Sequence, residues 1–133
     1  MKIAGQFLRF SVIGAAGFII DVSVLYLAHY LGLDLYSARL VSFISAATFT
    51  WIGNRLFTFR TGSRKGREMA GEWAAYLAAM TVGGLINYGT YALLISFSPL
   101  FHDHPWMAVA GGTAAGLLVN FLSARKILHV PPG

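Results

Sequence analysis

Long apolar stretches, each interrupted by only a few polar residues, run through most of this chain. They cover residues 7–31, 35–57, 73–97 and 105–127. A helix of about 20 residues crosses the roughly 30 Å hydrocarbon core of a bilayer, so each stretch is long enough to span a membrane. Because lipid offers the backbone no hydrogen-bond partners, the spans should be helical. The pattern predicts an all-α membrane protein with four transmembrane helices, arranged as two hairpins in a single domain over residues 1–133.

The first stretch also has features of a cleaved signal peptide, whose apolar core normally has about 7–15 residues before a small-residue cleavage site. Here the apolar run extends from Phe10 to Leu31 and ends in Ala28-His29-Tyr30, so we expect a permanent span. Composition agrees with lipid surroundings, because 56% of the residues are hydrophobic and 11% are charged. Globular domains carry about a quarter charged residues. Little sequence remains outside the spans, and we expect no soluble domain.

Basic residues gather on one side of this four-span arrangement. They are Lys2, Arg9, Arg55, Arg60, Arg64, Lys65, Arg67, Arg125 and Lys126, while Arg39 falls toward the other side. The positive-inside rule therefore places both termini and the 58–72 loop in the cytoplasm. A nucleic-acid role for residues 64–67 is the weaker alternative, because anionic lipid headgroups attract juxtamembrane basic residues by roughly 1 kcal/mol each. We expect membrane lipids, and no nucleic acid, as partners.

The two halves of the chain share a weak internal similarity. Gly17–Asp21 and Gly83–Asn87 both place a glycine four residues before a polar residue, with an offset of 66 residues. The even-numbered spans align either without a gap, so that Asn54 falls on Asn120, or with four extra residues in the loop Ser98 to Pro105, so that Thr50-Trp51 falls on Asn120-Phe121 and Arg55 on Arg125. We favour the second register. It predicts a parallel repeat related by an axis along the membrane normal, although ordinary four-helix hydropathy can mimic such a similarity.

Small and polar residues recur on one face of three spans. The stripes are Gly14, Gly17 and Asp21; Ala46, Thr50 and Asn54; and Gly112, Gly116 and Asn120. Such patterns let helix backbones approach closely, so we expect the glycines to form helix–helix contacts. The polar residue that ends each stripe should face the protein. We expect Asn87 and Asn120 to form interhelical hydrogen bonds, and Trp51, Trp73 and Trp106 to lie at the membrane interfaces.

Asp21 lies about midway along the first apolar run. A centred charge costs roughly 2.5–3.5 kcal/mol on insertion scales, so something inside the protein must compensate it. A cavity, a partner or a bound ligand would do so. The alternative is a structural acid, paired with an arginine or bonded to hydroxyls such as Ser23. With a hairpin tip near Gly32-Leu33, Asp21 should face Ala46 and Ala47.

Two arginines lie toward opposite ends of the second span. Arg39 and Arg55 are 16 residues apart, about 24 Å along a helix. A guanidinium binds two phosphate oxygens through parallel hydrogen bonds. One arginine near each membrane face, with an acid between them, suits an anionic group that crosses the membrane. The alternatives are that either arginine reaches to the interface, or that Arg39 pairs with Asp34.

Signals for catalysis are weak. His102-Asp103-His104 looks like a metal-binding triplet, but it lies in a short loop without further ligands nearby, and structural metal sites need about four. We find no Ser/His/Asp arrangement, no phosphate-binding glycine loop and no cofactor fingerprint, and the absence of cysteine removes thiol chemistry. We expect no enzymatic activity, no cofactor and no metal.

Two stretches resemble the GtrA-like family of small four-span membrane proteins. They are residues 9–17, which open the first span, and residues 50–59, which close the second. The second stretch is similar to the family pattern Asn-Phe-x-x-Asn-Arg-x-Trp-Thr-Phe. It keeps Asn54, Arg55, Thr58 and Phe59, and departs from the pattern at Thr50, Trp51 and Phe57. A weaker echo follows at Asn120-Phe121 and Arg125-Lys126.

The resemblance implies translocation of a polyprenyl-phosphate-linked monosaccharide, such as undecaprenyl-phosphate-glucose, to the outer leaflet of a bacterial inner membrane. A membrane glycosyltransferase would make this lipid inside, and another enzyme would use it outside for cell-surface polysaccharide. We expect the substrate-binding residues to be Asp21, Arg39, Thr50, Asn54, Arg55, Asn87, Asn120 and Arg125. Arg55 would capture the phosphate inside and Arg39 would receive it outside, while the acid and the amides solvate the headgroup or gate its passage.

Two other functions stay open. In the first, the protein is a membrane anchor that recruits or stabilises the glycosyltransferase, and the basic 60–67 loop is its docking surface. Alternatively it would be a small proton-coupled exporter of hydrophobic cations, against which the arginines argue. Because 133 residues barely enclose a headgroup-sized path, we expect a homo-oligomer, most simply a dimer.

Overall fold

The computed structural model describes residues 2–59 and 66–128, which are almost entirely helical. The helices are α1 (Ile3–Tyr30), α2 (Leu35–Gly53), α3 (Gly66–Phe97), α4 (Pro99–Asp103) and α5 (Pro105–Leu128), and α2 continues into a π-helical turn, η1 (Asn54–Thr58). The all-α fold predicted from the sequence is confirmed. Most of the basic 60–67 loop lies outside the described residues.

Helices α1 and α2 form the first hairpin. At its tip Gly32 has a φ of +108°, a backbone conformation that glycine adopts without steric cost. The Leu33 amide donates to the Ala28 carbonyl at 3.1 Å and closes the turn. The Asp34 carboxylate then accepts a hydrogen bond from the Ser37 amide at 3.1 Å, which caps the start of α2. The tip therefore lies where the sequence predicted it.

Glycines control how closely α1 and α2 approach. At Gly17 an added Cβ would overlap the Thr50 side chain. The two helices can therefore come into contact there only because residue 17 has no side chain. At Gly14 no atom lies within 4 Å of the position of a Cβ. The predicted packing role of Gly14 is therefore wrong, because this face of α1 borders an open groove instead of another helix.

Helices α3 and α5 form the second hairpin. The short helix α4 lies in the predicted loop between them and begins at Pro99. Gly116 on α5 packs directly against α3, because an added Cβ would lie 2.9 Å from the Asn87 Cβ and 3.0 Å from the Gly83 carbonyl oxygen. The close helix–helix contact predicted from the small residues of α5 is confirmed.

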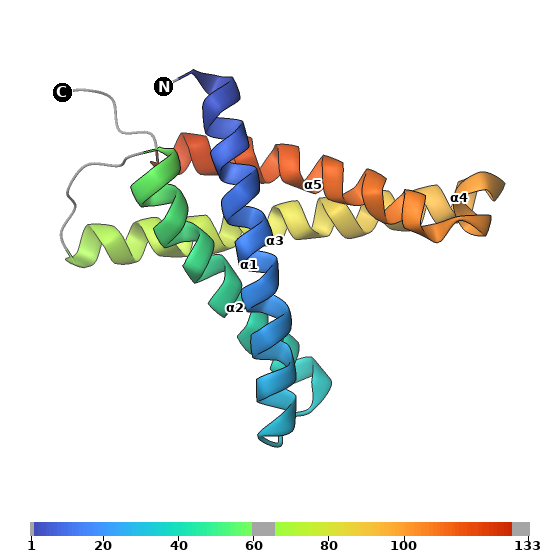
Figure 1. Ribbon diagram of the computed structural model, residues 1–133, viewed down its shortest axis with the longest axis horizontal. Coiled ribbons are helices and arrows are strands. Elements are labelled where there is room, and N and C mark those ends of the chain that lie inside the picture. The colour runs from blue at the N-terminus through green and yellow to red at the C-terminus, as the bar shows by residue number, and fades with distance from the viewer. Residues whose placement is uncertain (1, 60–65, 129–133) are drawn as a thin grey trace.

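The two hairpins meet at one end and diverge at the other (Figure 1). In that view α1 and α2 run downward from the meeting point, while α3 and α5 run to the right. We call the end where the hairpins meet the junction end. The opposite ends of the two hairpins lie apart from each other, and we call them the tips; the α1–α2 tip carries Gly32 and the α3–α5 tip carries α4. The hairpins are therefore not packed side by side along their whole length.

The hydrophobic core lies at the junction end. Its buried residues are Phe10, Ala47, Trp51, Phe59, Tyr76, Met80, Phe121, Ala124 and Leu128. Phe121 is central, because its ring packs edge-on against Phe7 and Phe10 with centroids 5.2 and 5.6 Å apart. Such edge-to-face pairs add to the stabilisation from apolar burial. Because α1, α2, α3 and α5 all contribute, this cluster holds the two hairpins together.

The described helices expose much apolar surface. Helices α1 and α3 are long and apolar enough to cross a membrane, by length and composition. Only 11% of the residues in the most apolar window of each helix are buried within the molecule. A soluble protein would turn helices of this hydropathy toward its core. The exposed surface therefore indicates lipid surroundings, while four spans and a fixed orientation in the membrane stay predictions.

Candidate substrate groove

A groove with a volume of about 510 Å³ lies between the hairpins, where they diverge from the junction end. Cavities of this size hold small ligands or headgroups. Helices α1, α2, α3 and α5 supply the walls, together with one residue of η1. The predicted site residues that line the groove are Asp21, Arg39, Thr50, Asn54, Asn87 and Asn120, whereas Arg55 and Arg125 are not among its lining residues.

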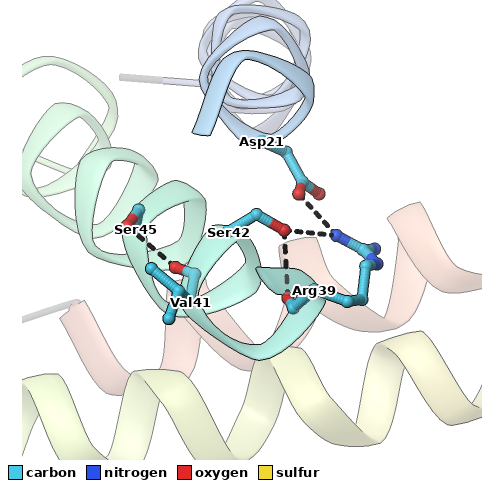
Figure 2. A network of polar contacts seen from close by, with 5 residues as sticks. All are labelled: Asp21, Arg39, Val41, Ser42 and Ser45. Atoms are coloured by element: carbon cyan, nitrogen blue, oxygen red, sulfur yellow. Dashed lines mark hydrogen bonds and ion pairs between the residues drawn. The ribbon is translucent and has the colours of Figure 1, made fainter. Parts of the chain in front are cut away.

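The wall formed by α1 and α2 carries the charged groups of the groove (Figure 2). Arg39 Nη1 donates both to the Asp21 carboxylate on the neighbouring helix and to the Ser42 hydroxyl, the latter at 3.1 Å. Ser42 is fully buried, and its hydroxyl donates to the Arg39 carbonyl at 3.0 Å. An arginine therefore compensates the membrane-depth carboxylate, which was one of the two sequence-based alternatives.

This ion pair corrects two expectations. Asp21 does not find its contacts at Ala46 and Ala47, because Arg39 reaches across the hairpin to it. Gly17, one turn nearer the junction end, is the residue of α1 that approaches Ala46. Arg39 pairs with Asp21 rather than with Asp34, which instead caps α2.

Arg39 keeps binding capacity beyond this pair. Its side chain is 57% exposed, against 19% for Asp21. Both hydrogen bonds of the Arg39 side chain are donated by Nη1. Its Nε and Nη2 groups therefore have no partner among residues 2–59 and 66–128. These two N–H groups share one edge of the guanidinium, and that edge matches two oxygens of a phosphate. The α1–α2 wall can therefore accept an anion.

The wall formed by α3 and α5 is uncharged and carries Asn87, Thr113 and Asn120. Neither asparagine side chain hydrogen-bonds to another described residue, and the Asn120 Oδ1 is buried without a donor. The Asn120 amide lies against Gly83, and the Asn87 Oδ1 lies against Gly112. The predicted interhelical hydrogen bonds of the two asparagines are wrong, because each amide packs against a glycine that has no side chain to offer.

Tyr76 closes the groove at the junction end. Its hydroxyl accepts a hydrogen bond from Asn54 Nδ2 at 3.0 Å and donates to Thr50 Oγ1 at 3.1 Å. The Asn54 Oδ1 in turn accepts from the Thr58 hydroxyl at 2.7 Å. Tyr76, Asn54 and Thr58 are each at most 1% exposed. This network joins α2, η1 and α3 at the junction end of the groove.

Glu72 links the hairpins one turn before Tyr76. Its buried Oε1 accepts hydrogen bonds from Trp51 Nε1 and from Arg55 Nε, both at 2.9 Å. The Arg55 side chain is 11% exposed, so it is directed into the junction rather than away from the protein. Trp51 is buried, and its indole N–H is directed to the Glu72 carboxylate, so its predicted position at the membrane interface stays a prediction.

Two further hydrogen bonds complete the junction. Trp73 Nε1 donates to Thr48 Oγ1 at 2.9 Å, and Arg125 Nε donates to Gln6 Oε1 at 3.0 Å. The predicted site residue Arg125 therefore ties α5 to α1. Within the described chain the polar links between the hairpins lie at this end, so the groove is closed there and opens toward the tips.

The stretch of residues 50–59 builds this junction. The Phe59 amide donates to the Asn54 carbonyl at 2.9 Å, the i+5 hydrogen bond of a π-turn. Such turns often occur at functional sites. The extra residue lets the side chains of Asn54, Arg55 and Thr58 all bond within the junction, while the Phe59 ring packs against Phe121 with centroids 6.1 Å apart.

A comparison with known families identifies the family of the chain. A family model described as the GtrA/DPMS transmembrane domain matches residues 9–128. The chain belongs to this family. No curated protein and no solved structure shows significant similarity to it. GtrA/DPMS domains are membrane domains associated with polyprenyl-phosphate-sugar processes, so the protein is a membrane protein and the resemblance seen in the sequence is confirmed.

Two junction residues of this GtrA/DPMS domain escaped the sequence analysis, namely Glu72 and Tyr76. The third span was predicted to start at residue 73, whereas α3 begins at Gly66. A helical stripe runs through Glu72, Tyr76, Met80, Gly83 and Asn87, at spacings of three and four residues. Residues at these spacings share one helix face. This polar stripe was the available signal for the inner face of α3.

The described histidine and acidic side chains outside the groove form no cluster that could hold a metal ion. The His102 ring and the Asp103 carboxylate lie 3.6 Å apart on α4, and both side chains are 72% exposed. Among the described residues, no group of three or more His, Cys, Asp or Glu side chains lies close enough to hold a metal ion. The groove is therefore the feature on which a function can be argued.

Proposed function

We propose that this GtrA/DPMS domain translocates a polyprenyl-phosphate-linked monosaccharide from the cytoplasmic to the outer leaflet of a bacterial inner membrane. The observation that supports this most directly is a groove with a guanidinium edge available for an anion. The flanking helices present apolar surfaces outward. A phosphate-linked headgroup would occupy the groove while its prenyl tail stays in lipid.

Arg39 is the phosphate anchor in this proposal. A phosphodiester that enters a membrane needs a cation to offset the loss of its hydration. Because Asp21 and Ser42 hold Nη1, the guanidinium keeps a defined orientation at the groove instead of reaching away to the interface. Nε and Nη2 then provide parallel donors for two phosphate oxygens.

Arg55 has a supporting role rather than the phosphate-capturing role suggested by its position in the sequence. Its side chain is only 11% exposed and is paired with the buried Glu72 carboxylate, whereas the Arg39 side chain is 57% exposed. Arg55 lies beside the groove floor and outside the residues that line the groove. We therefore assign Arg55 to the junction that holds the hairpins at a fixed separation.

The orientation of the groove follows from the basic residues. Arg9, which donates to the Phe57 carbonyl at 2.9 Å, lies at the junction end together with Arg125 and Lys126. The positive-inside rule places this end in the cytoplasm. The groove in this state would then be closed toward the cytoplasm and open toward the outer leaflet, as expected for a translocator that releases its lipid there.

Exchange of a labelled prenyl-phosphate-glucose between the leaflets of liposomes containing the purified protein tests this proposal. We expect exchange by the wild type, and a rate lowered about 10- to 100-fold by Arg39→Gln, since hydrogen bonds to charged groups contribute about 1.5–3 kcal/mol. Arg67→Gln is the matched control, because Arg67 is exposed at the start of α3 and outside the groove. It should exchange lipid at the wild-type rate.

Two results would overturn the proposal. An Arg39→Gln protein that exchanges lipid as fast as the wild type would remove the phosphate anchor. Wild-type protein that exchanges no lipid would favour the scaffold function, in which the chain only recruits or stabilises a membrane glycosyltransferase. Such a glycosyltransferase and a second copy of this chain are the proposed partners of the translocator, and co-purification of either measures that association.

A further inference from the structure

We propose that Asn87 and Asn120 form a separate subsite for the neutral hydroxylated ring of the substrate, opposite the phosphate anchor. This inference rests on the proposed function and assigns the two parts of the substrate headgroup to different walls of the groove. The α1–α2 hairpin would bind the anionic phosphate, and the α3–α5 hairpin would recognise an uncharged sugar. The two asparagines would then determine which headgroup the protein accepts.

Charge is distributed unevenly between the two walls of the groove. Asp21 and Arg39 lie on the α1–α2 wall, whereas the lining residues of α3 and α5 include no charged side chain. The polar groups of that second wall are the two amides, the Thr113 hydroxyl and the floor hydroxyl of Tyr76. A ligand that fills this groove meets an ionic side and a neutral polar side. A phosphate joined to a neutral sugar has the same two halves.

The two asparagines have unused hydrogen-bonding capacity. Neither side chain bonds to another described residue, and the Asn120 Oδ1 is buried without a donor. Buried polar atoms in native proteins nearly always find partners, so the Asn120 Oδ1 calls for a ligand or water. Asn87 is half-buried, and its amide lines the groove. An amide offers two donors and one acceptor, and this combination matches sugar hydroxyls, which also donate and accept.

Glycines in the fold make room for these amides. A side chain at Gly83 would overlap the Asn120 amide, and one at Gly112 would come within 2.7 Å of the Asn87 Oδ1. Glycine at both positions lets the amides lie at the contact between α3 and α5 while still lining the groove. The positions of the amides are therefore set by packing before any ligand binds, as preorganised recognition requires.

A comparison of two lipids tests the subsite without altering the protein. One is prenyl-phosphate-glucose, and the other is a prenyl-phosphate-cyclohexyl ester that keeps the phosphodiester and the ring but lacks the hydroxyls. We expect the wild-type protein in liposomes to exchange the glucosyl lipid about tenfold faster, since a site built for hydroxyls discriminates against analogues without them. Equal rates for the two lipids would overturn the inference while leaving the proposed function intact.

Variants then test whether the two asparagines cause the difference in exchange rate between the two lipids. Asn87→Leu and Asn120→Leu should slow the glucosyl lipid about tenfold and leave the cyclohexyl lipid unchanged, whereas Arg39→Gln should slow both. Thr81→Val is the matched control, because Thr81 lies on α3 but outside the groove and bonds the Leu77 carbonyl. Equal slowing of both lipids by the asparagine variants would overturn the subsite. Absence of exchange with either lipid in the wild type would instead refute the proposed function.

Discussion

At the scale of single residues, the groove depends on one arginine that serves two purposes. Arg39 compensates the Asp21 carboxylate through Nη1 and keeps its Nε and Nη2 groups available. The buried Ser42 hydroxyl supports the same nitrogen at 3.1 Å. In surroundings of low polarity an uncompensated carboxylate or guanidinium would be costly. The Asp21–Arg39 ion pair therefore keeps a charged guanidinium between apolar helices, while the pair as a whole has no net charge.

Asp21 should act through Arg39 rather than on the substrate. We expect Asp21→Asn to slow lipid exchange by less than Arg39→Gln does, because an asparagine still accepts one hydrogen bond from the guanidinium. The double variant should be no slower than Arg39→Gln alone, since residues that act as a unit are not additive. Exchange rates of the two single variants and the double variant measure this. A double variant much slower than either single one would show that Asp21 contacts the lipid directly.

At the scale of helices, the positions of glycines determine where the helices come into close contact. Gly17 brings α1 onto α2, and Gly116 brings α5 onto α3. Gly14 belongs to the same predicted stripe as Gly17 but borders the groove. The stripe thus contains one packing position and one open position, and a spacing rule does not distinguish them. Side-chain periodicity identifies a helix face, but the neighbour on that face depends on the packing of the other elements.

The contact of α3 with α5 should be sensitive to a single methyl group. Gly116→Ala places a Cβ 2.9 Å from the Asn87 Cβ and 3.0 Å from the Gly83 carbonyl oxygen, so we expect a destabilisation of about 1–3 kcal/mol from overpacking. Gly89→Ala is the control, because no atom lies within 4 Å of its Cβ position and alanine favours helix by up to about 1 kcal/mol. Thermal unfolding in detergent compares the two. Equal midpoints would contradict the tight contact.

At the scale of the whole molecule, the groove exists because the hairpins are joined at one end. The junction combines the aromatic cluster around Phe121 with the hydrogen bonds of Glu72 and Tyr76. Toward the tips, Asp21 and Arg39 bond within one hairpin. The separation of the two walls is therefore set at the junction end, where the hairpins are joined.

Glu72 should carry much of the stability of the junction. Glu72→Ala removes the shared acceptor of Trp51 and Arg55, and breaking a buried ion pair from one side costs about 3–5 kcal/mol. Glu68→Ala removes an exposed carboxylate of the same helix and should be close to neutral. Unfolding midpoints in detergent measure both effects. Similar midpoints for the two variants would mean that the ion pair does not hold the hairpins together.

The sequence predicted the local features well, because they depend on neighbours along the chain. Apolar run lengths placed helices at α1, α2, α3 and α5, and the position of Gly32 marked a tip. The misplaced charge of Asp21 correctly implied an internal partner. The stretch of residues 50–59 correctly indicated the GtrA/DPMS family. The function proposed from that resemblance is still a proposal.

The chain by itself determined that it forms helices suited to lipid and that a carboxylate within them must be compensated, since both follow from hydrophobicity and local hydrogen bonding. Only the tertiary structure decided that Arg39 serves the groove while Arg55 serves the junction. The reason is physical: Glu72 lies on α3, and no spacing within α2 reveals which arginine a carboxylate on another helix will neutralise. The same holds for Asn87 and Asn120, whose amides lack partners because glycines lie opposite them.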